Sequence, residues 1–297
     1  MASSNARRLP LYVISLLCLA LIVVSSAIYL STHRKWQPES LAMAPDGTLI
    51  VGSASSPFVY RVPRNSSSKT KLIDASAEGK GTFFFGVLSD LSANTLWVCQ
   101  LTPVSDTNPK RLHSTLRSFD LATAAPRLRW ELPGDNTMCN DLTIGSDKTL
   151  YFTDTRNGRI YRLVSGASEA TLFLEHAALV GIDGITVLDG RLYVNNVFTN
   201  RLYRIETDET GKAVQPVEIQ LDQPLKGPDG MRAANGRLIV AENAAGRISA
   251  LTINGDHASV QVLREGLKTP TGVEPSGDTI WIAERAAGRT LSIPMPR

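Results

Sequence analysis

Three acidic residues and one asparagine stand at the starts of short strand-forming segments. They are Glu39, Asn140, Asp183 and Asp229. Carboxylate and amide oxygens are the ligands that a hard divalent ion such as Ca²⁺ prefers, and the absence of His and Cys from the set argues against Zn²⁺. Three carboxylates held close together also repel strongly unless a cation neutralises them. These residue types therefore predict a site for a divalent metal cation, most consistent with Ca²⁺.

The four side chains can meet only if the segments that carry them are related by symmetry, and the sequence contains such a repeat. Six segments join a polar turn to a strand-forming run, with equivalent apolar residues at Leu49, Leu96, Leu150, Leu192, Leu238 and Ile280. Successive members are 47, 54, 42, 46 and 42 residues apart. Repeats of about 40 to 50 residues with several strands each are typical of β-propellers. The sequence thus predicts an all-β, six-bladed propeller.

Each repeat is expected to contribute an innermost strand, and the candidate ligands open four of the six. Alternating apolar and polar residues between Asp-Gly or Asn-Gly turns predict antiparallel hairpins. The innermost strands are expected at residues 40–44, 85–90, 140–145, 183–188, 229–234 and 271–275. The last repeat has only three strands, so residues 31–38 are the available donor of a closing strand, which would remove an exposed edge.

Position in the repeat separates the candidate ligands from ordinary turn residues. Asp-Gly is more often a structural turn than a ligand site, and Asn140 taken alone would suit a strand cap. The turn dipeptides of this chain, such as Asp189-Gly190, lie elsewhere in the repeat. Blades two and six offer Phe85 and Thr271 at the opening position, so the predicted site interrupts the sixfold symmetry.

The first 30 residues differ in kind from the rest. The stretch from Leu9 to Leu30 has no charged residue and is flanked by basic residues on both sides. A span needs about 20 apolar residues, and this run exceeds the usual core of a signal peptide. We expect residues 1–30 to be a signal anchor, or alternatively a cleaved signal peptide, and residues 31–297 to be the propeller domain. Both alternatives place the propeller outside the cytoplasm, periplasmic or secretory, and an uncleaved anchor would attach it to a membrane.

The remaining composition narrows the function classes. The chain has 297 residues, 43% of them hydrophobic, and a net charge of +3 without a basic patch, so nucleic-acid binding has no support. Cys99 and Cys139 are expected at strand ends on one face, where an extracytoplasmic compartment permits a disulfide; two separate buried thiols are the alternative. Residues 101–115 are polar and aperiodic, which predicts a long loop; it either lies over the pocket mouth, where it would shape substrate access, or is a solvated excursion.

The chain resembles the SMP-30/gluconolactonase/LRE-like family of six-bladed propellers, which is related in fold to paraoxonases. The resemblance covers Glu39 to the C-terminus and rests on three motifs: CNDLTIGSDKTLYFTDT, GIDGITVLDGRLYV and GPDGMRAANGRLIVAE. It implies that the divalent cation, often calcium in the family, is held by Glu39, Asn140, Asp183 and Asp229. It also implies hydrolysis of a lactone or related ester, in which the metal polarises the carbonyl and a carboxylate activates water.

Two positions depart from the family pattern. Asp183 stands where the family usually has Asn, and Met138 stands where sugar-lactone members tend to have Arg. By resemblance, the water-activating carboxylate is Asp229, with Asp183 as the alternate. No Gly-x-Ser-x-Gly segment is present, and neither His113 nor His176 opens an innermost strand. The alternative function is a non-enzymatic extracytoplasmic propeller that binds a ligand or protein and uses calcium structurally.

Overall fold

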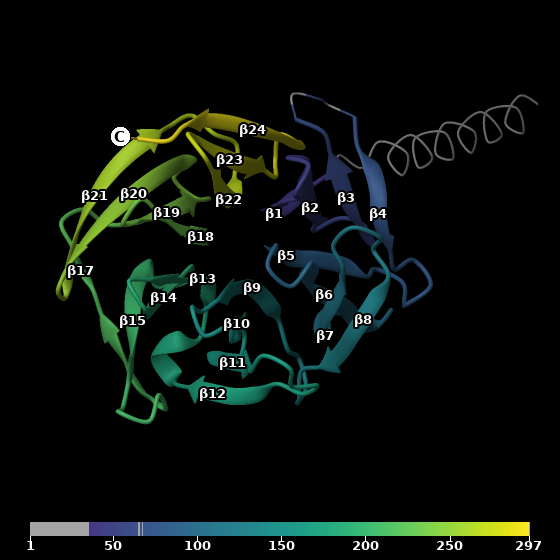
Figure 1. Ribbon diagram of the computed structural model, residues 1–297, viewed down its shortest axis with the longest axis horizontal. Helices are drawn as coiled ribbons and strands as arrows, with labels where there is room; N and C mark the ends of the chain where they lie inside the picture. Colours follow the sequence, from purple (N-terminus) through teal and green to yellow (C-terminus); the bar gives the residue numbers. More distant parts are fainter. Residues whose placement is uncertain (1–35, 65, 67, 297) are drawn as a thin grey trace, which may run out of the picture. The chain divides into compact units, whose positions relative to one another are not determined.

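The computed structural model describes residues 36–64, 66 and 68–296 and shows six sheets of mainly antiparallel strands around a central axis (Figure 1). The sheets, which we number as blades one to six in chain order, each place one strand nearest the axis. These innermost strands are β1 (Pro38–Met43), β5 (Phe83–Asp90), β9 (Cys139–Ile144), β13 (Ile182–Leu188), β18 (Pro228–Ala234) and β22 (Pro270–Ser276). The prediction of an all-β, six-bladed propeller is confirmed, and all six innermost strands lie within two residues of their expected bounds.

The outer strands follow in chain order from the axis outwards. The second strands are β2 (Leu49–Ser53), β6 (Thr95–Ser105), β10 (Leu150–Asp154), β14 (Arg191–Asn196), β19 (Arg237–Glu242) and β23 (Thr279–Glu284). The third strands are β3 (Phe58–Val62), β7 (Asn108–Asp120), β11 (Arg159–Leu163), β15 (Arg201–Thr207), β20 (Arg247–Asn254) and β24 (Arg289–Pro294). The fourth strands are β4 (Thr70–Asp74), β8 (Pro126–Glu131), β12 (Thr171–Glu175), β16 (Ala213–Glu218) and β21 (His257–Arg264).

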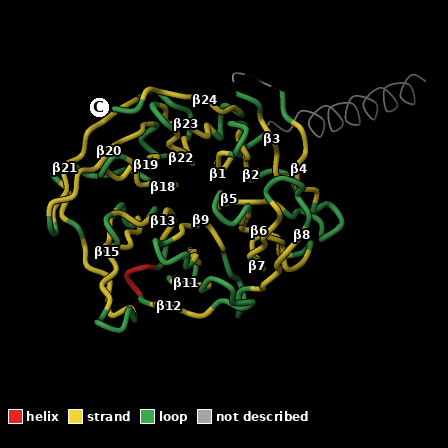
Figure 2. The backbone as a smooth tube through the Cα atoms, in the orientation of Figure 1, coloured by secondary structure: helices red, strands yellow, loops and turns green. Residues whose placement is uncertain are grey.

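Two further elements depart from this plan. The two-residue strand β17 (Gln220–Leu221) pairs in parallel with β21, so the residues that follow the fourth strand of blade four join blade five. A short 3-10 helix η1 (Ala177–Leu179) precedes β13 and is the red segment of Figure 2.

Tight turns set the register of the hairpins. Between β13 and β14, Asp189 and Gly190 have φ of 49° and 74°. Two successive residues of positive φ form the turn whose twist suits a two-residue hairpin, and Asp and Gly tolerate that conformation. The turn pairs Leu188 with Arg191 and so fixes which side chains of both strands point into the core.

The hydrophobic core lies between neighbouring blades, and the first and last blades meet in the same way as the others. Leu41 and Val51 of blade one pack with Trp281 and Ala283 of blade six. The Thr271 hydroxyl also donates to the Glu39 carbonyl oxygen at 2.8 Å. Within the described residues blade six has three strands, without the donor strand expected from residues 31–38, of which 31–35 lie outside the described part.

The expected anchor or signal segment, residues 1–30, also lies outside the described residues. In the part of the chain that the structure describes, no helix is long and apolar enough to cross a membrane.

Residues 101–115, expected to form a loop, instead lengthen a hairpin. Strands β6 and β7 remain paired through Leu101 with Ser114, Thr102 with His113, and Ser105 with Asn108. This extension projects beyond the blade and has many exposed side chains, which removes the apolar alternation that normally marks a strand. The prediction of a loop was therefore wrong, although the segment does extend from the end of the propeller where the innermost strands begin.

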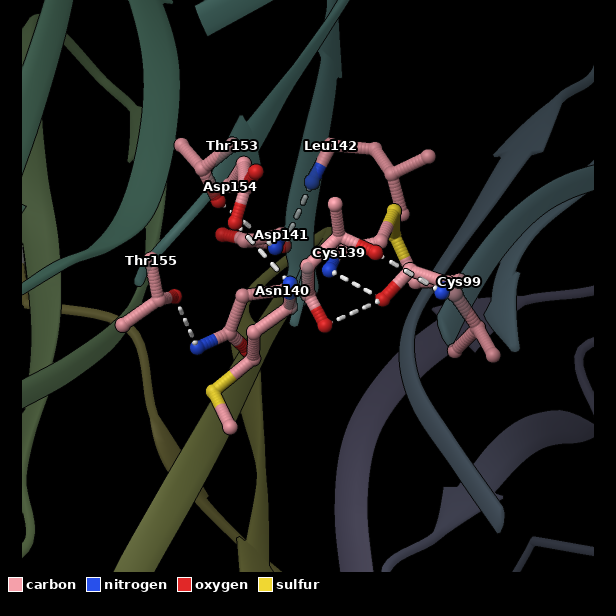
Figure 3. The surroundings of a disulfide bond; sticks show 12 residues. Cys99, Cys139, Asn140, Asp141, Leu142, Thr153, Asp154 and Thr155 are labelled. Atoms are coloured by element: carbon pink, nitrogen blue, oxygen red, sulfur yellow. Dashed lines mark hydrogen bonds between the residues drawn. A yellow bond between two sulfur atoms is a disulfide. The ribbon is translucent and has the colours of Figure 1, made fainter. Parts of the chain in front are cut away.

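Cys99 of β6 and Cys139 of β9 form a disulfide that joins blades two and three (Figure 3). This resolves the alternatives that the sequence left open. The bond joins residues that are 40 apart in sequence, and closing a loop of that length in the unfolded chain contributes about 4 kcal/mol to stability by the chain-entropy relation.

We expect the double variant Cys99→Ala/Cys139→Ala to lose about 2–5 kcal/mol of unfolding free energy, because its unfolded chain regains the lost conformational freedom. Urea unfolding followed by circular dichroism measures the difference. Reducing the wild-type protein should produce a similar loss and should not affect the variant further. An unchanged midpoint after complete reduction would contradict this expectation.

Candidate functional site

The four sequence-predicted ligands lie where the innermost strands are irregular. Each of β1, β9, β13 and β18 departs from regular pairing with its second strand at the residue in question: Glu39, Asn140, Asp183 and Asp229. A bulge places an extra residue on one strand and turns a side chain away from the regular alternation. The irregularities therefore free these four side chains from the cores between the blades. We call the four residues the axial set.

Glycines allow the opening residues of neighbouring blades to approach one another. A Cβ added to Gly184 would lie 2.4 Å from the carbonyl oxygen of Asp229, and one added to Gly272 would lie 2.7 Å from that of Glu39. Real Cβ atoms do not approach so closely, so only glycine fits. The glycine after Asp183 thus serves inter-blade packing, with the turns of the chain located elsewhere.

Hydrogen bonds join members of the axial set and fix their orientation. Asn140 donates through its Nδ2 to Asp183 Oδ2 at 2.8 Å and to Thr155 Oγ1 at 3.0 Å, the latter drawn in Figure 3. Asp229 accepts from Asn243 Nδ2 at 2.7 Å and from the backbone N–H of Gly230 at 3.0 Å. The structure thus brings residues that are far apart in sequence into one site.

A second layer of the site was missed by the sequence prediction. The residue directly after the second strand contacts an axial side chain in three places: Thr155 with Asn140, Asn243 with Asp229, and Arg285 with Glu39. The sequence does contain a signal for these three residues, because each directly follows an acidic residue that ends the second strand of its blade: Asp154, Glu242 or Glu284.

Those acidic strand ends have a structural role. Glu242 accepts from the backbone N–H of Lys226 at 2.7 Å, and Glu284 accepts from that of Lys268 at 2.5 Å. Asp154 accepts from the backbone N–H of Met138 at 2.9 Å. Each therefore ties the segment that enters the innermost strand to the second strand of its own blade.

Burial and mutual repulsion perturb all three axial carboxyl groups. Burial, together with the negative charge of Glu39, raises the pKa of Asp229 to about 7, against the opposing effect of Arg285. Burial, with the charges of Asp229 and Glu39, raises the pKa of Asp183 well above its usual range. Burial also raises the pKa of Glu39, although Arg285 opposes this shift. The three carboxyl groups are therefore close enough to titrate as a coupled set.

The axial set has oxygens available for a ligand. Glu39 Oε1, Asn140 Oδ1 and Asp183 Oδ1 accept no hydrogen bond from any described residue. None of these three oxygens is a fully buried atom without a hydrogen-bond partner, so each oxygen is accessible to water. Free carboxylate and amide oxygens around a negatively charged site fit a hard divalent cation. In the present arrangement, no three His, Cys, Asp or Glu side chains of the described residues are grouped closely enough to hold a metal ion.

A buried ion cluster, which we call the inner ion cluster, adjoins the axial set. Arg232 of β18 donates to both carboxylate oxygens of Asp141, at 3.0 and 2.8 Å, and its Nε lies 3.6 Å from Glu274. Burial raises the pKa of Glu274 to about 7 against the opposing charge of Arg232. Asp141 also accepts from the backbone N–H of Ile185 at 3.1 Å. The cluster links blades three, four, five and six.

The two histidines singled out in the sequence lie outside the axial set. His113 is exposed on the β6–β7 extension, and His176 is exposed and accepts from the backbone N–H of Ala178 at 3.2 Å. A groove of about 490 Å³ is also remote from the axial set, because the turns after β9, β13 and β15 line it at the opposite ends of the innermost strands. Neither feature contributes to the site.

Fold and site together define a six-bladed β-propeller with a polar, carboxylate-rich axial site. No protein-family model matches the chain, and no curated protein matches its sequence. Among solved structures, a gluconolactonase from Xanthomonas campestris is 16% identical, with a TM-score of 0.65 over 88% of this chain and 86% of that one.

Other solved structures with this architecture differ in activity. A catalytically inactive virginiamycin B lyase from Staphylococcus aureus, solved with quinupristin, is 18% identical, with a TM-score of 0.57 over 88% of this chain and 95% of that one. A chain of the nidogen–laminin complex is 16% identical, with a TM-score of 0.60 over 82% of this chain and 88% of that one. At these identities the similarities establish the fold alone.

Proposed function

We propose that this protein is a divalent-metal-dependent hydrolase of lactones or related esters. The observation that carries the proposal is the convergence of three buried carboxyl groups and one amide from four blades, with unpaired oxygens that water reaches. The similarity in fold to a gluconolactonase supports the same reaction class. Glu39, Asn140, Asp183 and Asp229 are the residues that would hold the cation, most consistent with Ca²⁺.

The cation, when bound, supplies a Lewis acid for the carbonyl oxygen and stabilises the negative charge that develops there. The protein supplies orientation. Asn140 holds Asp183 through its Nδ2, and Thr155 in turn holds Asn140, so the orientation of these two side chains relative to each other is fixed by hydrogen bonds.

Asp229 is the proposed general base, with Asp183 as the alternate. A carboxylate oxygen of Asp229 would take a proton from water as the water oxygen bonds to the carbonyl carbon. The same proton would pass to the leaving alkoxide when the ring C–O bond breaks. Asn243 positions Asp229 by donating to its Oδ2. A base with a pKa near the working pH is the most effective in such transfers.

A non-enzymatic binding propeller is the alternative. The match to a chain of the nidogen–laminin complex favours it, because that propeller fold occurs in a protein–protein assembly. A lactone panel discriminates between the two functions. Turnover that depends on Asp229 supports the hydrolase, and an absence of turnover by metal-loaded protein supports the binding module.

An extracytoplasmic location remains a proposal as well. The Cys99–Cys139 disulfide supports it, because such bonds persist mainly in oxidising compartments. Attachment to a membrane through residues 9–30 is proposed from the sequence alone.

Metal binding should stabilise the fold, since an ion that binds only the folded state shifts the unfolding equilibrium. With Ca²⁺ at about 100 times its dissociation constant, we expect about 2.7 kcal/mol of stabilisation, equivalent to about 5 °C in the unfolding midpoint. Differential scanning calorimetry of the full chain, with Ca²⁺ and after chelation, measures it. If the protein retains no divalent ion on metal analysis and Ca²⁺, Mg²⁺ and Mn²⁺ leave the midpoint unchanged, the metal site is wrong.

A further inference from the structure

Arg285 brings a positive charge into the axial set. Its guanidinium donates through an Nη atom to Glu39 Oε2. Its electrostatic partners are Glu39, Asp229 and Asp183, which are all three axial carboxyl groups. The side chain is 28% exposed, so it reaches the site from the solvent side. Arg285 is therefore a tethered counter-cation for these carboxylates.

Comparison with the other blades shows that the charge at this position is not needed for scaffolding. Arg285 follows the second strand of blade six, just as Thr155 follows that of blade three and Asn243 that of blade five. Thr155 and Asn243 are neutral, and each makes the corresponding contact to an axial side chain. A hydrogen bond with a neutral residue, as acceptor (Thr155) or donor (Asn243), therefore suffices to orient an axial residue, and the guanidinium adds positive charge besides.

A guanidinium and a divalent ion cannot both be close to Glu39 without strong repulsion, because like charges a few ångströms apart in a partly buried site are poorly screened. In the present arrangement Arg285 occupies one oxygen of Glu39, and the carboxylates are not grouped closely enough to hold an ion within the described residues. The Oε1 of the same carboxylate accepts no hydrogen bond from a described residue, so Glu39 retains an oxygen for a metal ion once the guanidinium has left and the axial carboxylates have moved closer together.

We propose that Arg285 and the divalent cation are alternative partners of Glu39, so that metal binding requires the guanidinium to leave the axial set. This inference rests on the proposed metal site. It makes Arg285 the residue that sets the metal affinity of the site: its charge weakens ion binding and compensates the carboxylates when the ion is absent. Among the described residues, the Nε of Arg285 is buried without a hydrogen-bond partner, and the one side-chain hydrogen bond of Arg285 that metal binding would break is the one to Glu39.

The test is calorimetric titration of the full chain with Ca²⁺ alone, after chelation, for wild type, Arg285→Met and Arg285→Asn. Met preserves much of the side-chain length without charge, and Asn is the residue that blade five has at the same position. We expect both variants to bind Ca²⁺ at least about tenfold more tightly than wild type. The control is Arg289→Met in the same blade, whose exposed side chain pairs with Glu284 outside the axial set, and it should bind like wild type.

The outcomes separate this inference from the proposed function. Tighter binding by both uncharged variants supports competition. Unchanged or weaker binding by a variant that still folds, while wild type binds, overturns the competition and leaves the metal site intact. No binding by wild type or by any variant overturns both. Circular dichroism with and without Ca²⁺ identifies a variant that fails to fold, and the second substitution then decides the question.

Discussion

Replacing Asp229 by Asn should reduce lactone hydrolysis at least about 10³-fold in kcat/KM. Asn cannot accept the proton of the attacking water, a loss that alone is worth about 10²–10⁴-fold, and it also removes a charged ligand from the proposed metal site. The measurement is the rate of ring opening over a panel of γ- and δ-lactones that includes gluconolactone, with Ca²⁺ present. Turnover that survives the substitution on every hydrolysed lactone would rule out Asp229 as the base.

The stability of Asp229→Asn shows whether a loss of activity comes from a lost base or from a damaged fold. The pKa of Asp229 in the folded protein, about 7, is higher than the usual value of a carboxyl group. The folded state therefore binds this proton more tightly than the unfolded state does. The stability that the bound proton contributes is present at low pH and is lost as pH rises through about 7. Without metal at pH 8, Asp229→Asn should thus be no less stable than wild type. Asp189→Asn, in an exposed turn where Asn tolerates the positive φ, should retain full activity and stability.

The architecture was predictable because one rule is repeated six times. Alternation specifies the hairpins locally, and Asp-Gly or Asn-Gly turns reinforce it in three of the repeats; Asp189-Gly190 adopts the positive-φ turn that its residues favour. The rule failed where a hairpin leaves the core. In the β6–β7 extension both faces are largely exposed, so hydrophobic alternation gives no signal, and pairing is set only by continuation of the ladder through Thr102 and His113.

The axial set was predictable in its members but not in its contacts. Glu39 and Asp229 were identified because they occupy the same place in different repeats, which requires no knowledge of side-chain orientation. Arg285 and Asn243 were missed, because the neutral and charged residues at their repeat position share no chemical type. Their role depends on the bulges that redirect the innermost strands, and a bulge leaves no mark on hydrophobic periodicity.

The inner ion cluster was beyond sequence reasoning for a different reason. Asp141 and Arg232 are 91 residues apart, and they meet because β9 and β18 both line the axis. Arg232 lies three residues after Asp229 on the same strand, and Glu274 lies three residues after Thr271, so the cluster forms a layer displaced along the axis from the axial set. Closing the propeller brings these charges together.

Replacing Arg232, the positively charged residue of the inner ion cluster, should lower the free energy of unfolding more than replacing Asp229, Arg285 or Arg289. Arg232→Met leaves Asp141 and Glu274 as buried carboxyl groups without a counter-charge, and breaking a buried ion pair by removing one partner costs about 3–5 kcal/mol. We expect the unfolding midpoint to fall by about 10 °C at pH 8. Urea unfolding and calorimetry of the full chain without metal measure the loss.

The pH dependence of this loss distinguishes electrostatics from packing. Without Arg232 the pKa of Glu274, already about 7, should rise further, because Arg232 is the charge that lowers it. Near pH 5 Glu274 is then protonated and neutral, so the cost of Arg232→Met should be smaller than at pH 8, and Glu274→Gln in the same chain should recover part of it. Arg201→Met breaks an exposed pair with Glu218 and should leave the unfolding free energy nearly unchanged at both pH values. An equal loss at pH 5 and pH 8 would instead assign the effect of Arg232 to packing.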